Sequence, residues 1–346
     1  MKNIILMTLI VIMSISIFAV PFYSDVRPGY GVTEEKWLSD YFSGLKDTWG
    51  DTKVYVLKGK EPGASALLLG GTHGNEISGI MAAMMYVERA NVQKGTLYVI
   101  VRANNSNATY HEKLVAGTPD WVEFETQSGK RVVSYGSRRT NPLHQGNDPE
   151  KYRYPGTELE FEGAEARNLN RVHPGNPDGT LTEKISYGIF ELIRKEKIDM
   201  VLDMHEAGTK SRLAYTLVCN PKNIDMGAMV MLDLEQHDLG FKLEQSSKEF
   251  RGLSHKEIGD QTDAIAFLSE TPNPGQDYGD YDGWSRQGLA DVVNDAQYPL
   301  SHRVAVQVET FRLLCDYLPM FYEKEIIIQN IPSYDEISDN LFGFYN

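Results

Sequence analysis

The stretch Ala66-Leu67-Leu68-Leu69, followed at once by Gly70-Gly71-Thr72-His73-Gly74-Asn75-Glu76, decides the fold class of this 346-residue chain. The four apolar residues predict a buried strand, and Glu76 opens a helical pattern that continues through residues 77–84. A glycine-rich turn between a strand and a helix leaves the backbone free to bend sharply. His73 and Glu76 are therefore expected to converge on one point at the end of the strand.

Strand and helix patterns alternate along the rest of the chain. Strands are expected at residues 53–57, 66–70, 96–102, 198–203 and 263–270, and helices at residues 37–45, 77–90, 182–195 and 300–318, the last one closed by Pro319. This alternation predicts a single α/β domain with a mostly parallel, mixed central sheet that helices cover on both faces. The domain is expected to span residues 25–346, with a core at about 50–318 and a tail at 319–346 that packs back on it.

Two long segments, residues 104–163 and 271–291, show no sustained period. Loops of that length inside a compact domain are usually functional. We expect both to form walls over the site.

A third ligand is expected at the end of the strand at residues 198–203, which runs into Met204-His205-Glu206. Active sites gather at the carboxyl ends of strands in open α/β sheets. His73, Glu76 and His205 form a ligand set suited to zinc that leaves one position for water. Asp203 is expected to orient an imidazole from behind. Two alternatives stay open: His205 is a hydrogen-bonded strand-end histidine, or Glu206 is the functional residue.

Three blocks of sequence, taken in order, carry a resemblance. Residues 70–76, residues 168–175 (Asn-Leu-Asn-Arg-Val-His-Pro-Gly) and residues 203–206 (Asp-Met-His-Glu) resemble successive blocks of the zinc metallocarboxypeptidase superfamily. The closer match is its deacylase branch, the succinylglutamate desuccinylase/aspartoacylase family. The similarity covers about residues 50–318. One departure is Asn168, which stands where the family commonly has Asp.

The resemblance implies a metallocarboxypeptidase-like (phosphorylase/hydrolase-like) fold, one zinc ion per chain and water that attacks an amide carbonyl. Cobalt or manganese could take the place of zinc in such a site. It also implies that Asn170 and Arg171 grip a substrate carboxylate, for which the planar fork of an arginine is suited. A further arginine of the family polarises the scissile carbonyl. Arg138, Arg139 and Arg167 compete for that role, and we take Arg139 as the candidate.

The general acid/base is expected at Glu270. The apolar run 263–269 ends at this residue and a turn signal follows, which matches a strand-end glutamate of the family. A carboxylate beside a metal can take a proton from water and deliver it to the leaving amine. Glu309 is the runner-up, but the apolar spacing around it predicts a helix on which Glu309 faces solvent.

Composition and the first residues bear on location. Lys2 precedes an uncharged apolar run at residues 4–20, so residues 1–24 are expected to be a signal peptide or an N-terminal membrane anchor, and the protein to be exported. The net charge of −14 argues against nucleic-acid partners and leaves the membrane as a partner only through such an anchor. Cys219 and Cys315 are expected to be buried free thiols.

Three functions are consistent with these residues. The first is zinc-dependent deacylation of an N-acyl amino acid or a related small amide. The second is a zinc carboxypeptidase that trims C-terminal residues from peptides. Carboxypeptidases usually carry a tyrosine some twenty residues before the glutamate, and residues 246–260 hold none, which favours the deacylase. The third is a non-catalytic exported binding protein on a hydrolase scaffold.

Overall fold

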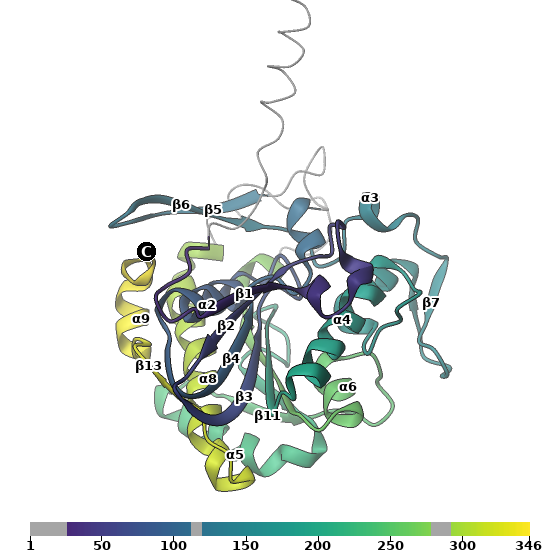
Figure 1. Cartoon of the computed structure of the whole chain (residues 1–346). Helices are drawn as coiled ribbons and strands as arrows, with labels where there is room; N and C mark the ends of the chain where they lie inside the picture. The colour runs from purple at the N-terminus through teal and green to yellow at the C-terminus, as the bar shows by residue number, and fades with distance from the viewer. Residues whose placement is uncertain (1–25, 112–119, 278–291) are drawn as a thin grey trace, which may run out of the picture.

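The computed structural model describes residues 26–111, 120–277 and 292–346 (Figure 1). The predicted leader, residues 1–24, and most of the second predicted wall lie outside the described residues. In the part of the chain that is described, no helix is long and apolar enough to cross a bilayer.

A large mixed sheet organises the described residues. Nine strands follow the order β1-β2-β4-β3-β9-β12-β10-β11, with β13 paired to β4. The central strands β4, β3, β9 and β12 run parallel, and antiparallel pairs flank them. The predicted mostly parallel, mixed sheet is confirmed. The strands are β1 (Glu34–Trp37), β2 (Lys53–Lys58), β3 (Glu61–Leu69), β4 (Asn91–Ile100), β9 (Met200–Ala207), β10 (Thr216–Cys219), β11 (Lys242–Gln245), β12 (Ile265–Pro272) and β13 (Ile327–Gln329).

Helices cover both faces of the sheet, as predicted (Figure 1). On one face lie α2 (Ile77–Arg89), α5 (Ile224–Leu234) and α8 (Leu300–Tyr322), and on the other α4 (Leu181–Glu196) and α6 (Ser254–Gln261). Strand β3 shows why two cores form. Ala66 and Leu68 join the core under α2 and α8, whereas Leu67 and Leu69 join the core under α4, because successive side chains of a strand point to opposite faces.

The predicted helix at residues 37–45 is wrong. Trp37 ends strand β1, and two short 3₁₀ turns follow, η1 (Leu38–Asp40) and η2 (Ser43–Leu45). Leu38 and Leu45 are still fully buried in the core under α4. The apolar spacing therefore correctly indicated which side chains are buried. Two separate 3₁₀ turns bury them as well as one helix would.

Helix α8 runs past its predicted end and includes Pro319. A proline keeps a helical φ and forfeits one N–H bond, a small loss close to the end of a helix. Cys219 and Cys315 are free and buried, as predicted. Beyond α8, the tail packs through β13 on β4 and through α9 (Tyr334–Asn340) on α8.

The predicted wall at residues 104–163 contains regular secondary structure, which the absence of a sustained period in its sequence did not indicate. Its described residues hold a hairpin of β5 (Asp120–Thr126) and β6 (Gly129–Tyr135), the short helix α3 (Pro142–Gln145), and a second pair of strands, β7 (Lys151–Arg153) and β8 (Glu160–Glu162). β7 and β8 have only three residues each, too few to show a period, and both strand pairs lie outside the main sheet.

A buried ion pair joins the β5–β6 hairpin to the core. The guanidinium of Arg131 on β6 donates to both carboxylate oxygens of Glu88 on α2, at 2.7 Å each, and neither side chain is exposed. Arg131→Met is expected to lower the free energy of unfolding by about 3–5 kcal/mol, because it leaves the Glu88 charge buried without its partner. Denaturant titration measures this, with Lys130→Met on the exposed side of the same strand as the matched control. Equal stability of the two variants would contradict the prediction.

Candidate metal centre and active site

His73 and Glu76 meet His205 at the carboxyl end of two neighbouring parallel strands. His73 lies in the turn between β3 and α2, and Glu76 is the residue that precedes α2. Strand β9, which carries His205, pairs with β3 in a register that sets Leu69 beside Asp203. The chain after Leu69 therefore emerges beside His205, and this places the three side chains together.

Glycine makes the tight turn feasible. Gly71 has a φ of +66°, a conformation that side chains disfavour. A Cβ on Gly74 would lie 2.6 Å from the side-chain oxygen of Asn107 and 2.9 Å from the carbonyl of Ser137. Asn107 in turn donates to the carbonyl of Thr72 at 3.0 Å. The backbone of the turn is thus held directly behind His73.

The ligand atoms of the three residues converge. Nδ1 of His73 lies 2.7 Å from Oε1 of Glu76, and Nδ1 of His205 lies 2.8 Å from Oε2 of the same carboxylate. The two Nδ1 atoms are 3.2 Å apart. All three side chains are buried, and they are the only group of three such ligands found among the described residues.

The outer nitrogens of the two rings show which inner atoms carry lone pairs. Nε2 of His73 lies 2.9 Å from the side-chain oxygen of Asn168, and Nε2 of His205 lies 2.8 Å from Oδ2 of Asp203. An acceptor at each Nε2 favours the ring proton there and turns a bare Nδ1 toward the partner ring. Two lone pairs and a carboxylate so close together repel unless a cation lies among them. The group could therefore hold a metal ion.

The pKa values agree with a need for a cation. Burial, together with the charge of Arg138, lowers the pKa of His73 to about 4, so this ring is neutral and ready to bind a metal. Burial also opposes a charge on His205, but the carboxylates of Asp203 and Glu76 outweigh it and raise its pKa well above the ordinary range. A proton or a metal ion must compensate these two carboxylates.

Asp203 lies behind His205, where the sequence places it. Thr72 donates its hydroxyl to Oδ1 at 2.8 Å, and Ser254 donates its hydroxyl to Oδ2 at 2.5 Å. Burial alone would raise the pKa of Asp203, but His205 and the two hydroxyls lower it to about 2. Asp203 is thus an ionised carboxylate fixed against the outer nitrogen of His205.

Glu270 lies beside the metal ligands. Its strand, β12, pairs with β9 in a register that sets Glu270 directly opposite His205. One oxygen of its carboxylate, Oε2, is buried and has no hydrogen-bond partner. Burial, reinforced by the charge of Glu76, raises the pKa of Glu270 to about 8, although His205 opposes the shift. A carboxyl group with these properties is suited to exchange protons near neutral pH.

Glu309 has a different setting. It lies on α8, as the helical spacing predicts, but it is buried rather than solvated. Its Oε2 accepts a hydrogen bond of 2.8 Å from Nε of Arg312, one turn further along the helix. This ion pair engages the carboxylate within its own helix.

The structure separates the competing arginines. Nη1 of Arg138 lies 3.4 Å from Oε1 of Glu76 and 3.5 Å from Nδ1 of His73. Arg139 instead donates twice to Glu165, and Arg167 pairs with Asp148. Of these three arginines, only Arg138 therefore reaches the candidate metal ligands.

Asn170 and Arg171 lie together on the far side of Asn168. The side-chain oxygen of Asn170 accepts a hydrogen bond of 2.8 Å from the backbone of Ser254. The guanidinium of Arg171 lies against the rings of Phe161 and Phe250, 5.6 Å and 5.4 Å from their centroids, and the two rings pack edge-to-face on each other. Burial and the charge of Arg138 lower the pKa of Arg171 to about 10, so it remains a cation beside two aromatic rings.

Several residues around the site escaped the sequence analysis. Gln276 donates to Oε1 of Glu76 at 3.2 Å and to the carbonyl of Glu206 at 2.8 Å. The carboxylate of Glu206 is buried on Arg303 and also accepts from Asn273 at 3.0 Å, so it belongs to a network behind Glu76. These partners lie tens to hundreds of residues apart, and no local motif marks them.

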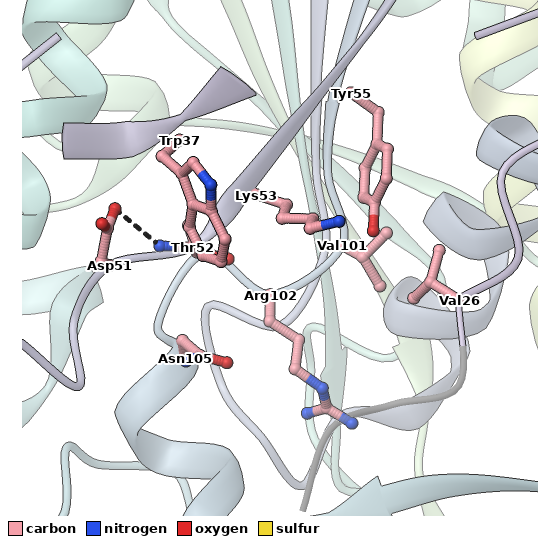
Figure 2. A pocket seen from close by; sticks show the side chains of 9 residues that line it. All are labelled: Val26, Trp37, Asp51, Thr52, Lys53, Tyr55, Val101, Arg102 and Asn105. Carbon is pink, nitrogen blue, oxygen red and sulfur yellow. Dashed lines mark hydrogen bonds between the residues drawn. The ribbon is translucent and has the colours of Figure 1, made fainter. Parts of the chain in front are cut away.

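A cavity of about 360 Å³ lies elsewhere, beside β2 and the end of β4 (Figure 2). Figure 2 shows Trp37, Lys53, Tyr55 and Arg102 around it. Its one carboxylate, Asp51, accepts from the backbone of Thr52, and none of the metal ligands lines it. The lining of this cavity offers no set of metal-binding side chains, in contrast to His73, Glu76 and His205.

The chain resembles known proteins in both sequence and structure. No protein-family model matches it. It is 27% identical over 169 residues to N-alpha-acetyl-L-2,4-diaminobutyric acid deacetylase of Halomonas elongata, a match that covers 48% of this chain and 35% of the relative. Its structure is similar to tripeptide-bound Csd4, a cell shape determinant of Helicobacter pylori, with a TM-score of 0.53, 12% identity and coverage of 83% of this chain and 59% of that chain.

The two likenesses agree with the three sequence blocks. The match spans about a third of the deacetylase and about three fifths of Csd4, which is a D,L-carboxypeptidase. At this level of identity the structural likeness concerns the fold alone. The chain therefore has an α/β fold similar to that of Csd4, and part of its sequence is similar to a deacetylase.

Proposed function

We propose that the protein is a zinc-dependent hydrolase that cleaves the amide bond of an N-acyl amino acid or a related small substrate bearing a carboxylate. The observation that carries the proposal is the convergence of three metal-ligand side chains beside Glu270, whose buried carboxylate oxygen has no partner. A zinc ion held by His73, Glu76 and His205 would act as a Lewis acid. It would lower the pKa of water, so that the water can give up a proton and attack a carbonyl near neutral pH.

Side chains of the protein carry out proton transfer, stabilise charge and bind the substrate. Glu270 takes the proton of the attacking water and delivers it to the nitrogen of the leaving amine, a role supported by its buried carboxylate oxygen that has no hydrogen-bond partner. Arg138, next to Glu76, is placed to stabilise negative charge that develops on the carbonyl oxygen. We therefore assign to Arg138 the role that the sequence analysis gave to Arg139. Arg171 and Asn170 hold the carboxylate of the substrate.

Deacylation is the first candidate, because the curated relative is a deacetylase. Phe250, in the segment where carboxypeptidases carry a tyrosine, packs its ring on Arg171 and has no hydroxyl to offer a peptide. Carboxypeptidase activity is the second candidate, since the structural relative Csd4 binds a tripeptide. Both reactions use the same three metal ligands and the same pair of residues, Asn170 and Arg171, to bind the substrate carboxylate. We call this pair the carboxylate clamp.

The experiment that tests the proposal is zinc analysis of the purified protein, followed by hydrolysis assays. We expect one zinc ion per chain and release of acetate from N-acetyl-L-2,4-diaminobutyrate or another N-acetyl amino acid. Release of a C-terminal residue from peptides, without deacetylation, would select the carboxypeptidase. A folded protein that takes up no zinc and cleaves neither class would overturn the proposal and leave the non-catalytic binding protein.

The clamp gives a separate prediction. Arg171→Lys is expected to raise KM about 10- to 100-fold with a smaller change in kcat, because a lysine cannot pair with a carboxylate through two parallel hydrogen bonds. Steady-state kinetics on the substrate identified above measures both constants. Arg153→Lys, on an exposed strand with surface ion pairs, is the matched control. An unchanged KM in the Arg171 variant would remove this residue from the binding site.

We also propose that the protein is exported, on the basis of the apolar run at residues 4–20. Fusion of residues 1–30 to a reporter enzyme that is active only outside the cytoplasm tests this. An inactive fusion that is nevertheless produced would contradict export.

A further inference from the structure

Asn168 is an uncharged residue that lies directly behind His73, one of the three candidate metal ligands. It occupies a position at which the family that the sequence resembles is expected to have Asp. Its side-chain oxygen lies 2.9 Å from Nε2 of His73. An amide oxygen can accept the ring proton, but it carries no net charge to strengthen the imidazole as a metal ligand.

The orientation of this amide is fixed from two sides. The same side-chain oxygen accepts a hydrogen bond of 3.0 Å from the backbone N–H of Asn170. Its NH₂ group donates to Oε2 of Glu165 at 2.8 Å. A flipped amide would set NH₂ against two donors and oxygen against a carboxylate. The hydrogen-bond network therefore leaves only one orientation, with oxygen toward His73.

The Glu165 carboxylate also holds Arg171 and a second arginine, Arg139. Nε of Arg171 lies 3.2 Å from Oε2 of Glu165, the oxygen that accepts from Asn168. Nε and Nη2 of Arg139 donate to the other oxygen at 3.0 and 2.7 Å. Burial works against the charge of Glu165, but Arg171, Arg138 and Arg139 lower its pKa to about 2, so it stays ionised.

These contacts form one continuous chain. It runs from Arg171 through Glu165 and Asn168 to His73, with a hydrogen bond or an ion pair at every step. Arg171 is further fixed by a hydrogen bond of 2.7 Å from its Nη1 to the carbonyl of Asn170. The Glu165 carboxylate is thus linked directly to Arg171 of the clamp and, through Asn168, to the candidate metal ligand His73.

We infer that Glu165 is a positioning residue that serves both halves of the site. Through Asn168 it supplies the negative charge behind His73, and through its ion pair it holds Arg171 in place for the substrate carboxylate. The negative charge behind His73 is therefore on Glu165, one hydrogen bond further from the ring than residue 168. This inference rests on the proposed function, because it requires a metal at His73 and a substrate at Arg171.

A rescue experiment separates the two roles of Glu165. The variants are Glu165→Gln, Asn168→Asp and the double variant, with Glu162→Gln as the matched control on the exposed end of β8. The first measurement is the Kd of zinc for the metal-free protein in competition with a chelator. The second is KM for the N-acetyl amino acid that the protein hydrolyses, with N-acetyl-L-2,4-diaminobutyrate as the first probe.

Glu165→Gln is expected to weaken zinc binding about tenfold, within the range for outer partners of metal ligands, and to raise KM. The double variant returns a carboxylate to the position behind His73, so zinc affinity is restored while KM stays high. Asn168→Asp alone sets two carboxylates at the 2.8 Å contact and is expected to bind zinc no better than the wild type. If Glu165 only supported folding, the double variant would not recover the Kd of zinc while KM stays high.

The outcomes distinguish this inference from the proposed function. Wild-type protein that binds zinc and hydrolyses the substrate, with Glu165→Gln equal to it in zinc Kd, would overturn the inference and leave the proposed function intact. Loss of zinc affinity in Glu165→Gln that Asn168→Asp does not restore would also overturn it. Wild-type protein that binds no zinc would overturn both.

Discussion

Glu270→Gln is expected to lower kcat about a thousandfold while zinc content stays at one ion per chain. The glutamine has nearly the same shape but cannot accept a proton from water or return it to the leaving amine, and such proton transfer contributes about 10²–10⁴-fold to rates. Because Glu270 is no part of the converging ligand group, the metal should stay bound. Steady-state kinetics and metal analysis on the same preparation measure the two effects.

Glu309→Gln is the matched control for this prediction. Glu309 is paired with Arg312 within α8, so its replacement is expected to leave turnover unchanged. A Glu270 variant with wild-type turnover, together with an inactive and folded Glu309 variant, would move the general base to α8. Zinc lost along with activity in Glu270→Gln would instead indicate that Glu270 supports the metal.

His205→Ala is expected to abolish zinc binding and, with it, hydrolysis. Apparent binding energies of structural zinc are about 10–16 kcal/mol, so one of four ligand positions accounts for on the order of 3–4 kcal/mol, or several hundredfold in Kd. The same change leaves Asp203 buried with no imidazole to pair with, so it is also expected to lower the free energy of unfolding. Metal analysis after dialysis against a chelator concentration at which the wild type keeps its zinc measures the loss.

His144→Ala controls for the loss of a histidine. His144 accepts or donates a hydrogen bond with Ser106 at 2.7 Å and stacks on Trp49, away from the metal ligands. This variant should keep one zinc ion per chain and its activity. Full zinc occupancy in His205→Ala, with the metal removed instead by the His144 change, would show that the metal binds elsewhere.

Much of the fold could be predicted from local patterns. The strand before His73 and the helix after Glu76 follow from a four-residue apolar run and a helical period, and both appear as β3 and α2. The same reasoning failed at residues 37–45, where two 3₁₀ turns bury the same leucines that a helix would bury. Burial of particular side chains is encoded there, but the backbone path between them is not.

The sequence by itself determined which residues could bind a metal, because His73 and Glu76 share one turn and His205 ends a strand that must lie in the same parallel sheet. It could not choose between Arg138 and Arg139, since neighbouring residues differ only in the side of the chain from which they project. It also gave no hint of Glu165, whose effect depends on three partners folded around it. Hydrogen bonds and ion pairs between distant segments form only when the whole sheet and its loops are in place, and so the tertiary structure alone decided how the metal ligands are oriented and how the clamp is held.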